Sequence, residues 1–208
     1  MESLEKFHWR FQISVLYDFD VNIKNSRVLC GIDEVGRGPL AGSVYAAAFI
    51  FPDFEIDGVN DSKKLSPKKR ELIFEKMIDK NVNYSIGSSS VEEIDRLNIL
   101  KATHLAMKRA VENLNIVPDL ILVDGKFIPD FGIETKAIIK GDSVSYSIAS
   151  ASIIAKVLRD RLMVKMHEKF PDYSFDRNKG YGTKAHIEAL KRVGPCEIHR
   201  KSFLKNII

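Results

Sequence analysis

Cysteine is scarce in this 208-residue sequence, which contains only Cys30 and Cys196. Two thiols cannot supply a four-cysteine metal cage, and nothing suggests a disulfide framework built in an oxidising compartment. The longest unbroken apolar run, Val44 to Phe51, is far shorter than the roughly 20 residues needed to cross a bilayer. Residues 1–6 are charged and amphipathic and do not have the apolar core of a secretory signal. We therefore expect a cytoplasmic protein without a membrane span.

An excess of charge is also missing, because the net charge is only +4 and the pI is near 8.9. This balance excludes a histone-like tail but agrees with a polyanionic partner. With 45% hydrophobic and 29% charged residues, the composition is that of a globular chain with one sizeable core. We expect one domain over residues 28–208, with residues 1–27 as an N-terminal extension packed on it.

The periodicity of apolar residues predicts an α/β fold with helices on both faces of a mixed sheet. Strands are expected at 28–34, 43–51, 83–89, 120–124 and 136–140, and helices at 66–80, 95–113, about 144–162 and 183–193. The short loop between the first two strands indicates an antiparallel pair. In the helix after residue 144, a long apolar stripe leaves Lys156, Arg159 and Arg161 off it.

Acidic residues lie at or just beyond the predicted carboxyl ends of three of these strands, and they are Asp33, Glu34, Asp124 and Asp142. Open α/β sheets bind ligands outside the carboxyl ends of their strands, so these carboxylates are expected to share one pocket. Oxygen ligands without His or Cys select hard ions such as Mg²⁺ or Mn²⁺. Two such ions, about 3.5–4 Å apart, would suit phosphodiester hydrolysis. Taken alone, Asp124-Gly125 and Gly141-Asp142 would instead be ordinary turns.

The segment after the first acids, Val35-Gly36-Arg37-Gly38-Pro39-Leu40-Ala41-Gly42, is rich in glycine. Glycines around Arg37 let bare backbone N–H groups approach a large polar ligand. The spacing of Gly36, Gly38 and Ala41 also fits a dinucleotide-binding loop. That loop must open a helix, whereas residues 44–50 are predicted to form a strand, so we disfavour it.

Several motifs together resemble type 2 ribonuclease H, also called ribonuclease HII, over about residues 29–204. They are residues 31–42, Asp61-Ser62-Lys63-Lys64-Leu65-Ser66, Val123-Asp124-Gly125, Lys140-Gly141-Asp142, residues 148–157, Arg159-Asp160-Arg161, Lys179-Gly180-Tyr181-Gly182-Thr183 and His199-Arg200-Lys201-Ser202-Phe203. The resemblance implies a ribonuclease H-like sheet flanked by helices, with a helical C-terminal region.

The resemblance also implies an activity, with Asp33, Glu34, Asp124 and Asp142 as catalytic, metal-binding acids. Two divalent ions, Mg²⁺ or Mn²⁺, would support hydrolysis of the RNA strand of RNA–DNA hybrids and cleavage at single ribonucleotides embedded in duplex DNA. The products would carry 5′-phosphate and 3′-hydroxyl ends. Roles in DNA replication and ribonucleotide excision repair, as a monomer, would follow. No motif identifies a replication clamp or polymerase as a partner.

Substrate contacts are implied residue by residue. Gly36, Arg37 and Gly38 resemble the family loop that reads the ribose 2′-hydroxyl, the group that separates RNA from DNA. Tyr181 resembles a tyrosine that stacks at the junction between a ribonucleotide and the next deoxynucleotide, although it could also fold onto the core.

Phosphate contacts are expected from the basic residues Lys63, Lys64 and Lys179, for each of which a solvated surface role is an equal alternative. Ser62 would hydrogen-bond a phosphate or cap a turn.

Outside the acids, we expect a structural role for His199 in preference to general-base work, and Arg200 and Phe203 are expected to pin the C-terminal segment. Asn178 departs from the family pattern, in which histidine is common at this position. The remaining rivals are a resolvase-like DNA nuclease on the same fold and a hybrid-binding protein without catalysis. The second would need one of the four acids to be missing.

Overall fold

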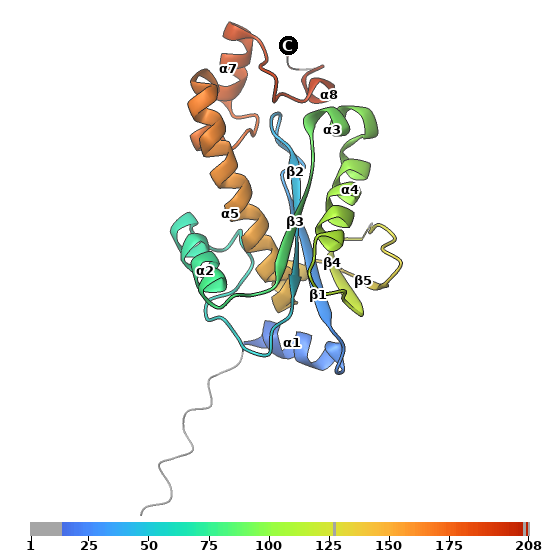
Figure 1. Cartoon of the computed structure of the whole chain (residues 1–208). Coiled ribbons are helices and arrows are strands. Elements are labelled where there is room, and N and C mark those ends of the chain that lie inside the picture. Colours follow the sequence, from blue (N-terminus) through green and yellow to red (C-terminus); the bar gives the residue numbers. More distant parts are fainter. Residues whose placement is uncertain (1–13, 127, 206, 208) are drawn as a thin grey trace, which may run out of the picture.

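The computed structural model describes residues 14–126, 128–205 and 207, and a five-stranded sheet forms its centre (Figure 1). The strands are β1 (Leu29–Val35), β2 (Val44–Ile50), β3 (Tyr84–Ser89), β4 (Leu120–Asp124) and β5 (Glu134–Ile138). Their order across the sheet is β3-β2-β1-β4-β5. The first three strands pair antiparallel, as the short loop before β2 predicts, whereas β4 runs parallel to both β1 and β5. The sheet is therefore mixed.

Helices cover both faces of the sheet, as Figure 1 shows with α5 and α4 on opposite sides of the strands. The described helices are α1 (Val15–Lys24), α2 (Pro67–Asp79), α3 (Val91–Leu97), α4 (Ile99–Glu112), α5 (Tyr146–Lys169), α6 (Phe175–Asn178), α7 (Lys184–Val193) and α8 (Lys201–Leu204). Helices α1 and α2 pack beside α5, and the C-terminal helices gather at one end. In the described ranges, no helix is both long and apolar enough to span a membrane.

The core has one apolar layer on each side of the sheet and a third under the C-terminal helices. Alternation along β4 divides the layers, because Leu122 faces α5 and Val123 faces α4. The third layer joins the loop after β1, through Leu40 and Ala41, to Tyr173 and Phe175. This third layer fixes the C-terminal region against the loop that follows the first acids.

The expected helix at 95–113 is wrong in one respect, because the chain forms two helices there. Ser90 and Glu93 form a reciprocal capping box that starts α3 at Val91. Asn98 then adopts φ 75°, which ends α3, and its side chain caps α4 by accepting from the Lys101 amide. Periodicity alone does not show a break of one residue between two helices of similar polarity.

Helix α5 also differs from its expected pattern. Its first ten residues are buried on all sides, since small alanines and serines let the helix lie close to β1. Arg159 was expected off the apolar stripe, yet it is fully buried.

The N-terminal extension is described only from residue 14. Its helix α1 buries Tyr17, whose hydroxyl donates to the Pro52 carbonyl, and Asp20. Asp20 accepts hydrogen bonds from the amide and hydroxyl of Ser147, in the first turn of α5. The aromatic residues before Ser14 lie outside the described residues.

The packing of β3 against α4 gives a stability test at Gly87. A Cβ at this residue would lie 2.0 Å from the Ala106 carbonyl oxygen, so Gly87→Ala must push helix and strand apart. Overpacking of this kind costs about 1–3 kcal/mol. We expect thermal unfolding to show a clearly lower Tm. Ser88→Ala, at the half-buried neighbour in the same strand, is the control, and an equal Tm for both variants would contradict the packing described.

Candidate metal centre and adjoining pocket

Three carboxylates meet at the end of the parallel strands. Asp33 comes from β1, Asp124 from the last residue of β4, and Asp142 from the short 3-10 helix η1 (Gly141–Ser143). One oxygen from each lies within 4.8 Å of the others. Asp33 and Asp142 are both only 4% exposed. The fold therefore concentrates negative charge where water is largely excluded.

Backbone amides hold two of these carboxylates in place. Asp33 Oδ1 accepts from the Glu34 amide at 2.8 Å. Asp124 Oδ1 accepts from the Gly141 amide at 2.7 Å, which ties β4 to the turn that carries Asp142. Since β1 and β4 are neighbouring parallel strands, the sheet brings together acids about ninety positions apart in the sequence.

Electrostatics favour a cation at this cluster. Burial raises the pKa of Asp33 well above its ordinary value, and the charges of Glu34 and Asp124 raise it further. Burial is also the largest cause of the raised pKa of Asp124, to which the Asp142 charge adds. A divalent ion would remove this repulsion, and an all-oxygen donor set suits Mg²⁺ or Mn²⁺. The residues present therefore fit a hard divalent cation.

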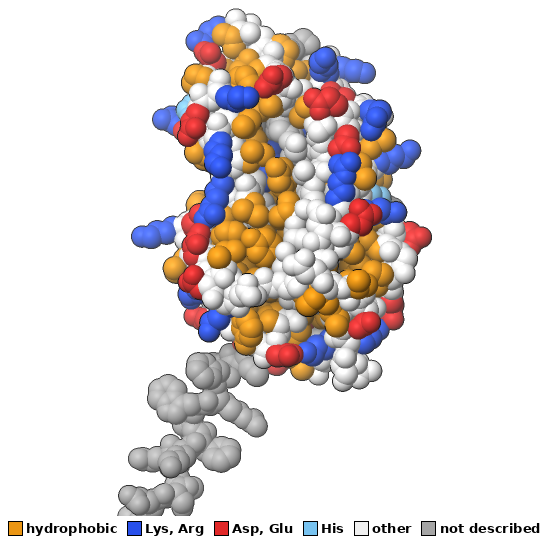
Figure 2. All heavy atoms as spheres, in the orientation of Figure 1, with side chains coloured by type: hydrophobic (Ala, Val, Ile, Leu, Met, Phe, Trp, Pro, Cys, Tyr) orange, Lys and Arg blue, Asp and Glu red, His pale blue; other side chains and the backbone are white. Residues whose placement is uncertain are grey.

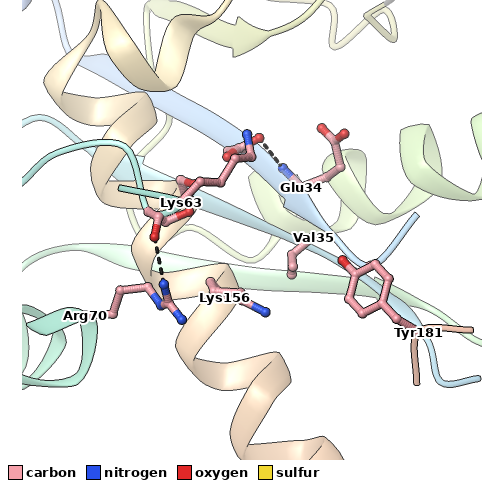
Figure 3. Close-up of a pocket in the computed structure, with 10 residues that line it drawn as sticks. Glu34, Val35, Lys63, Arg70, Lys156 and Tyr181 are labelled. Atoms are coloured by element: carbon pink, nitrogen blue, oxygen red, sulfur yellow. Dashed lines mark hydrogen bonds between the residues drawn. The ribbon is translucent and has the colours of Figure 1, made fainter. Parts of the chain in front are cut away.

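Glu34 lies beside the cluster and outside the group that meets within 4.8 Å. Strand β1 continues to Val35, so Asp33 and Glu34 point to opposite faces of the strand. The Glu34 carboxylate points away from Lys63 (Figure 3), and Arg37 Nη1 lies 3.5 Å from its Oε1. Burial raises the pKa of Glu34, with Arg37 opposing and Asp124 assisting. Glu34 thus stays coupled to the cluster through charge.

A pocket opens directly beside the acids (Figure 3). Its lining residues are Asp33, Glu34, Val35, Gly36, Ser62, Lys63, Arg70, Ser152, Lys156 and Tyr181. Asp33 and Glu34 thus share one cavity with the first glycine of the loop and with the tyrosine singled out in the sequence, whereas Asp124 and Asp142 do not line it.

The basic residues expected to contact phosphate have distinct surroundings. Lys63 Nζ donates to Asp142 Oδ2 at 2.8 Å, and this bond is the largest cause of its raised pKa. Lys64 Nζ donates to Ser143 Oγ at 3.3 Å. Lys179 Nζ donates to the Asp176 carbonyl and lies in an adjoining groove with Arg177. Lys63 is therefore the lysine of this set that reaches into the acid cluster.

Ser62 is buried, and its hydroxyl lies 2.7 Å from that of Ser152 on α5. Arg70, which was not singled out in the sequence, donates to the carbonyls of Ser62 and Leu65 and so fixes the segment that carries Lys63 (Figure 3). Lys156 is a second lining residue that sequence reasoning left unassigned. The signal in the sequence that could have pointed to Lys156 is its position off the apolar stripe of α5.

The loop after β1, which meets the pocket at Gly36, carries unpaired amides. Over the residues that the structure describes, the N–H groups of Gly36, Arg37 and Gly38 donate to no protein acceptor. Gly36 has φ 93°, a backbone conformation that side chains disfavour. An unpaired amide row beside a cation-binding cluster is suited to a ligand with hydroxyl or phosphate oxygens.

Tyr181 stands across the pocket from Lys63 (Figure 3) and remains 41% exposed. Its ring is close to Gly38, where an added Cβ would lie 3.7 Å from Tyr181 Cε1. Asn178 shapes the turn before it, because its amide donates to the Tyr173 carbonyl and its Oδ1 accepts from the Gly180 amide. The asparagine therefore supports the turn that presents the exposed ring.

A histidine pair fixes Tyr181 from behind. The Cys196 amide donates to His199 Nδ1 at 2.9 Å, so the Nε2–H of His199 donates to His186 Nε2 at 3.0 Å. The Nδ1–H of His186 then donates to the Tyr181 carbonyl. Burial lowers the pKa of both rings, that of His199 to about 4, which keeps this pair of histidines uncharged at neutral pH. His199 therefore has the structural surroundings expected for it, away from the acids.

Comparison with known proteins gives a consistent result. A family model described as Ribonuclease HII matches residues 30–206. The chain is 58% identical over 183 residues to the ribonuclease HII of Caldicellulosiruptor bescii, covering 88% of this chain and 89% of that protein. It is 50% identical to the ribonuclease HII of Burkholderia lata, covering 90% of this chain and 86% of that protein.

Solved structures agree with the sequence relatives. The crystal structure of ribonuclease H2 from Pyrococcus horikoshii matches with a TM-score of 0.68 and 28% identity, over 84% of this chain and 92% of that one. The ribonuclease HII of Archaeoglobus fulgidus, solved as a complex with PCNA, matches with a TM-score of 0.69 and 28% identity, over 86% of this chain and 96% of that one. The expected fold, a mixed sheet flanked by helices with a helical C-terminal region, is confirmed.

The acid cluster predicts how the protein responds to metal. We expect saturating Mg²⁺ or Mn²⁺ to raise the Tm of the wild type, because an ion at 100 times its dissociation constant stabilises by about 2.7 kcal/mol. In Asp33→Asn the metal-induced shift should be largely lost. The metal-free Tm of this variant should rise, because one buried like charge is gone. Thermal unfolding with and without chelator measures both effects.

Asp57→Asn, which removes an exposed acid that does not belong to the cluster, is the matched control and should behave as the wild type. A full metal-induced shift in Asp33→Asn would contradict the cluster as the metal centre.

Proposed function

We propose that this chain, which belongs to the ribonuclease HII family, cuts duplex DNA at single embedded ribonucleotides as well as the RNA strand of RNA–DNA hybrids. Ribonuclease H activity on hybrids is the function of the family. The observation that carries the proposal is the meeting of Asp33, Asp124 and Asp142 within 4.8 Å, beside a loop with free amides.

Metal-assisted hydrolysis is the chemistry that the acids support. Asp33, Asp124 and Asp142 would hold two divalent ions, with Glu34 approaching from the adjacent position on β1. Such ions activate water and stabilise the charge that develops on a scissile phosphate. Products with 5′-phosphate and 3′-hydroxyl ends are part of the proposal, as is action on hybrids and ribonucleotide-containing DNA in replication and ribonucleotide excision repair.

Recognition of the ribose would fall to the loop after β1. The 2′-hydroxyl both donates and accepts hydrogen bonds, and it is the one group that marks a ribonucleotide within DNA. Free N–H groups at Gly36, Arg37 and Gly38 can donate to it without a side chain in the way. Because Gly36 and Asp33 line the same pocket, the ribose would be read next to the bond that is cut.

Phosphate binding would come from the basic residues around the pocket. Lys63, Lys64 and Lys179 are proposed to hold the backbone of the substrate, with Ser62 acting through the segment that carries Lys63. Lys156 and Arg70 line the pocket between the acids and the groove that holds Lys179. These contacts position the duplex and carry no sequence information.

A single assay tests the proposed substrate and the metal requirement. The protein is incubated with labelled duplex DNA that contains one ribonucleotide, in Mg²⁺, in Mn²⁺ and with chelator, and the cut is mapped. We expect cleavage at the ribonucleotide with either metal and none with chelator. Asp33→Asn should abolish turnover while it leaves hybrid binding largely intact.

An all-DNA duplex is the control substrate in this assay. If it were cut as fast as the hybrid, the protein would be a DNA nuclease of the resolvase kind. Near-normal turnover by Asp33→Asn would remove the acid cluster from the mechanism.

The exposed ring of Tyr181 gives a second test. A base stacked on an aromatic ring gains about 1–3 kcal/mol, so Tyr181→Ala should lower kcat/KM at a single embedded ribonucleotide by about tenfold to a hundredfold. Tyr181→Phe keeps the ring and should retain most of this activity. Steady-state cleavage of the same duplex by both variants is the measurement, and unaltered cleavage by Tyr181→Ala would refute stacking.

A further inference from the structure

Arg200 is fully buried, yet it forms no ion pair within the described part of the chain. Its guanidinium donates instead to three backbone carbonyls of the loop after β1. Nη2 donates to Gly36 O at 2.6 Å, Nη1 donates to Arg37 O at 2.9 Å, and Nε donates to Gly42 O at 2.9 Å. The positive charge lies directly beneath the loop that faces the pocket.

Arg159 on α5 supports the same loop from a second direction. It donates to the carbonyls of Ala41, Ser43 and Lys179 at 3.0–3.2 Å. An added Cβ at Gly36 would lie 2.3 Å from Arg159 Nε, so the guanidinium packs against the backbone of the loop. Arg159 therefore joins the loop to Lys179, which lies two residues before Tyr181.

Backbone hydrogen bonds complete the support. The Arg200 amide donates to Leu40 O at 2.9 Å, and the Gly42 amide donates to Ile198 O at 2.8 Å. The Leu40 amide donates to Gly180 O at 2.8 Å. The loop is thus held by two distant parts of the chain, the turn before Tyr181 and the segment at 198–200.

The direction of these carbonyls decides where the free amides point. In a trans peptide the C=O and the following N–H point in opposite directions. Since the carbonyls of Gly36 and Arg37 face Arg200, the amides of Arg37 and Gly38 face away from it. These are two of the three amides that lack a protein acceptor.

A guanidinium is suited to this position for physical reasons. Its five donors form a rigid planar fork that can reach several carbonyls, whereas an ammonium is a compact, strongly hydrated charge. Burial is the largest cause of the lowered pKa of Arg200, to about 9, and of the lowered pKa of Arg159. The nearby Arg159 charge lowers the pKa of Arg200 further, so burying both guanidinium groups under one loop has a cost. Such a cost is retained where the geometry gained serves a function.

We propose that Arg200, assisted by Arg159, is a positioning residue for 2′-hydroxyl recognition: it turns the loop carbonyls inward so that the amides of Arg37 and Gly38 are presented to the ribose. The inference rests on the proposed function of that loop and adds the residues that set its geometry. Arg200 does not line the pocket, so it acts only through the loop.

Binding to matched duplexes tests this role. Affinities are measured in chelator, which prevents cleavage, for duplex DNA with one ribonucleotide and for the same duplex without it. The wild type should prefer the ribonucleotide. In Arg200→Lys the preference should fall about tenfold, equivalent to one hydrogen bond of roughly 1.4 kcal/mol. Binding to the all-DNA duplex should stay the same, because phosphate contacts are unchanged.

Arg192→Lys is the matched control, since Arg192 pairs with Asp172 on the surface and should keep the wild-type preference. Merely structural damage would weaken binding to both duplexes alike and leave their ratio unchanged, which would overturn the inference. A wild type that shows no preference would instead overturn the proposed function. Arg159→Lys provides an independent variant and should lower the ratio in the same direction.

Hydrogen exchange of the wild type keeps the inference open to test if both lysine variants fail to fold. The Leu40 and Gly42 amides should exchange as slowly as those in β1, because a loop held by buried arginines is ordered before substrate binds. Fast exchange at these amides would show that the arginines do not fix the loop, and the inference would fall.

Discussion

Repulsion among Asp33, Asp124 and Asp142 is the constraint around which the site is built. Two charges 4 Å apart interact by about 4 kcal/mol at an effective dielectric constant of 20, so the rest of the fold must hold these carboxylates together. The parallel register of β1 and β4 and the Gly141 amide do so, and the Lys63 ammonium supplies part of the missing positive charge. A centre held open in this way is ready for cations and needs little rearrangement to bind them.

Two of the four acids, Asp33 and Glu34, and the loop proposed to read the ribose belong to one continuous stretch of chain. Asp33 lies in β1 and Gly36 follows the strand by one residue, so covalent geometry fixes the spacing between them. Charges of opposite sign flank this stretch, with carboxylates at its strand end and two buried guanidinium groups beneath its loop. Under the proposed function, this arrangement would couple the position of the cut to the position at which the sugar is read.

Local patterns in the sequence predicted most of the fold, because β1, β2 and β4 are apolar runs and Ser66-Pro67 marks the start of α2. They also indicated the acids, which lie at or just beyond the ends of strands. They did not show the break at Asn98 or the burial of Arg159, since both depend on partners elsewhere in the chain. Arg70 was missed for the same reason, because a carbonyl acceptor leaves no trace in sequence. The separation of Glu34 from the other acids follows from strand alternation once β1 is seen to continue past it.

The attachment of the loop at 36–43 to Ile198 and Arg200 has a consequence for biosynthesis. A nascent chain that has formed β1 and β2 still has several loop carbonyls without donors until Arg200 has been synthesised. All four acids precede this segment, so the loop proposed to distinguish a ribose from a deoxyribose gains its full support only after the acids have been synthesised. Products truncated before Ile198 would therefore retain every strand of the sheet but lack the donors that Arg200 supplies to this loop.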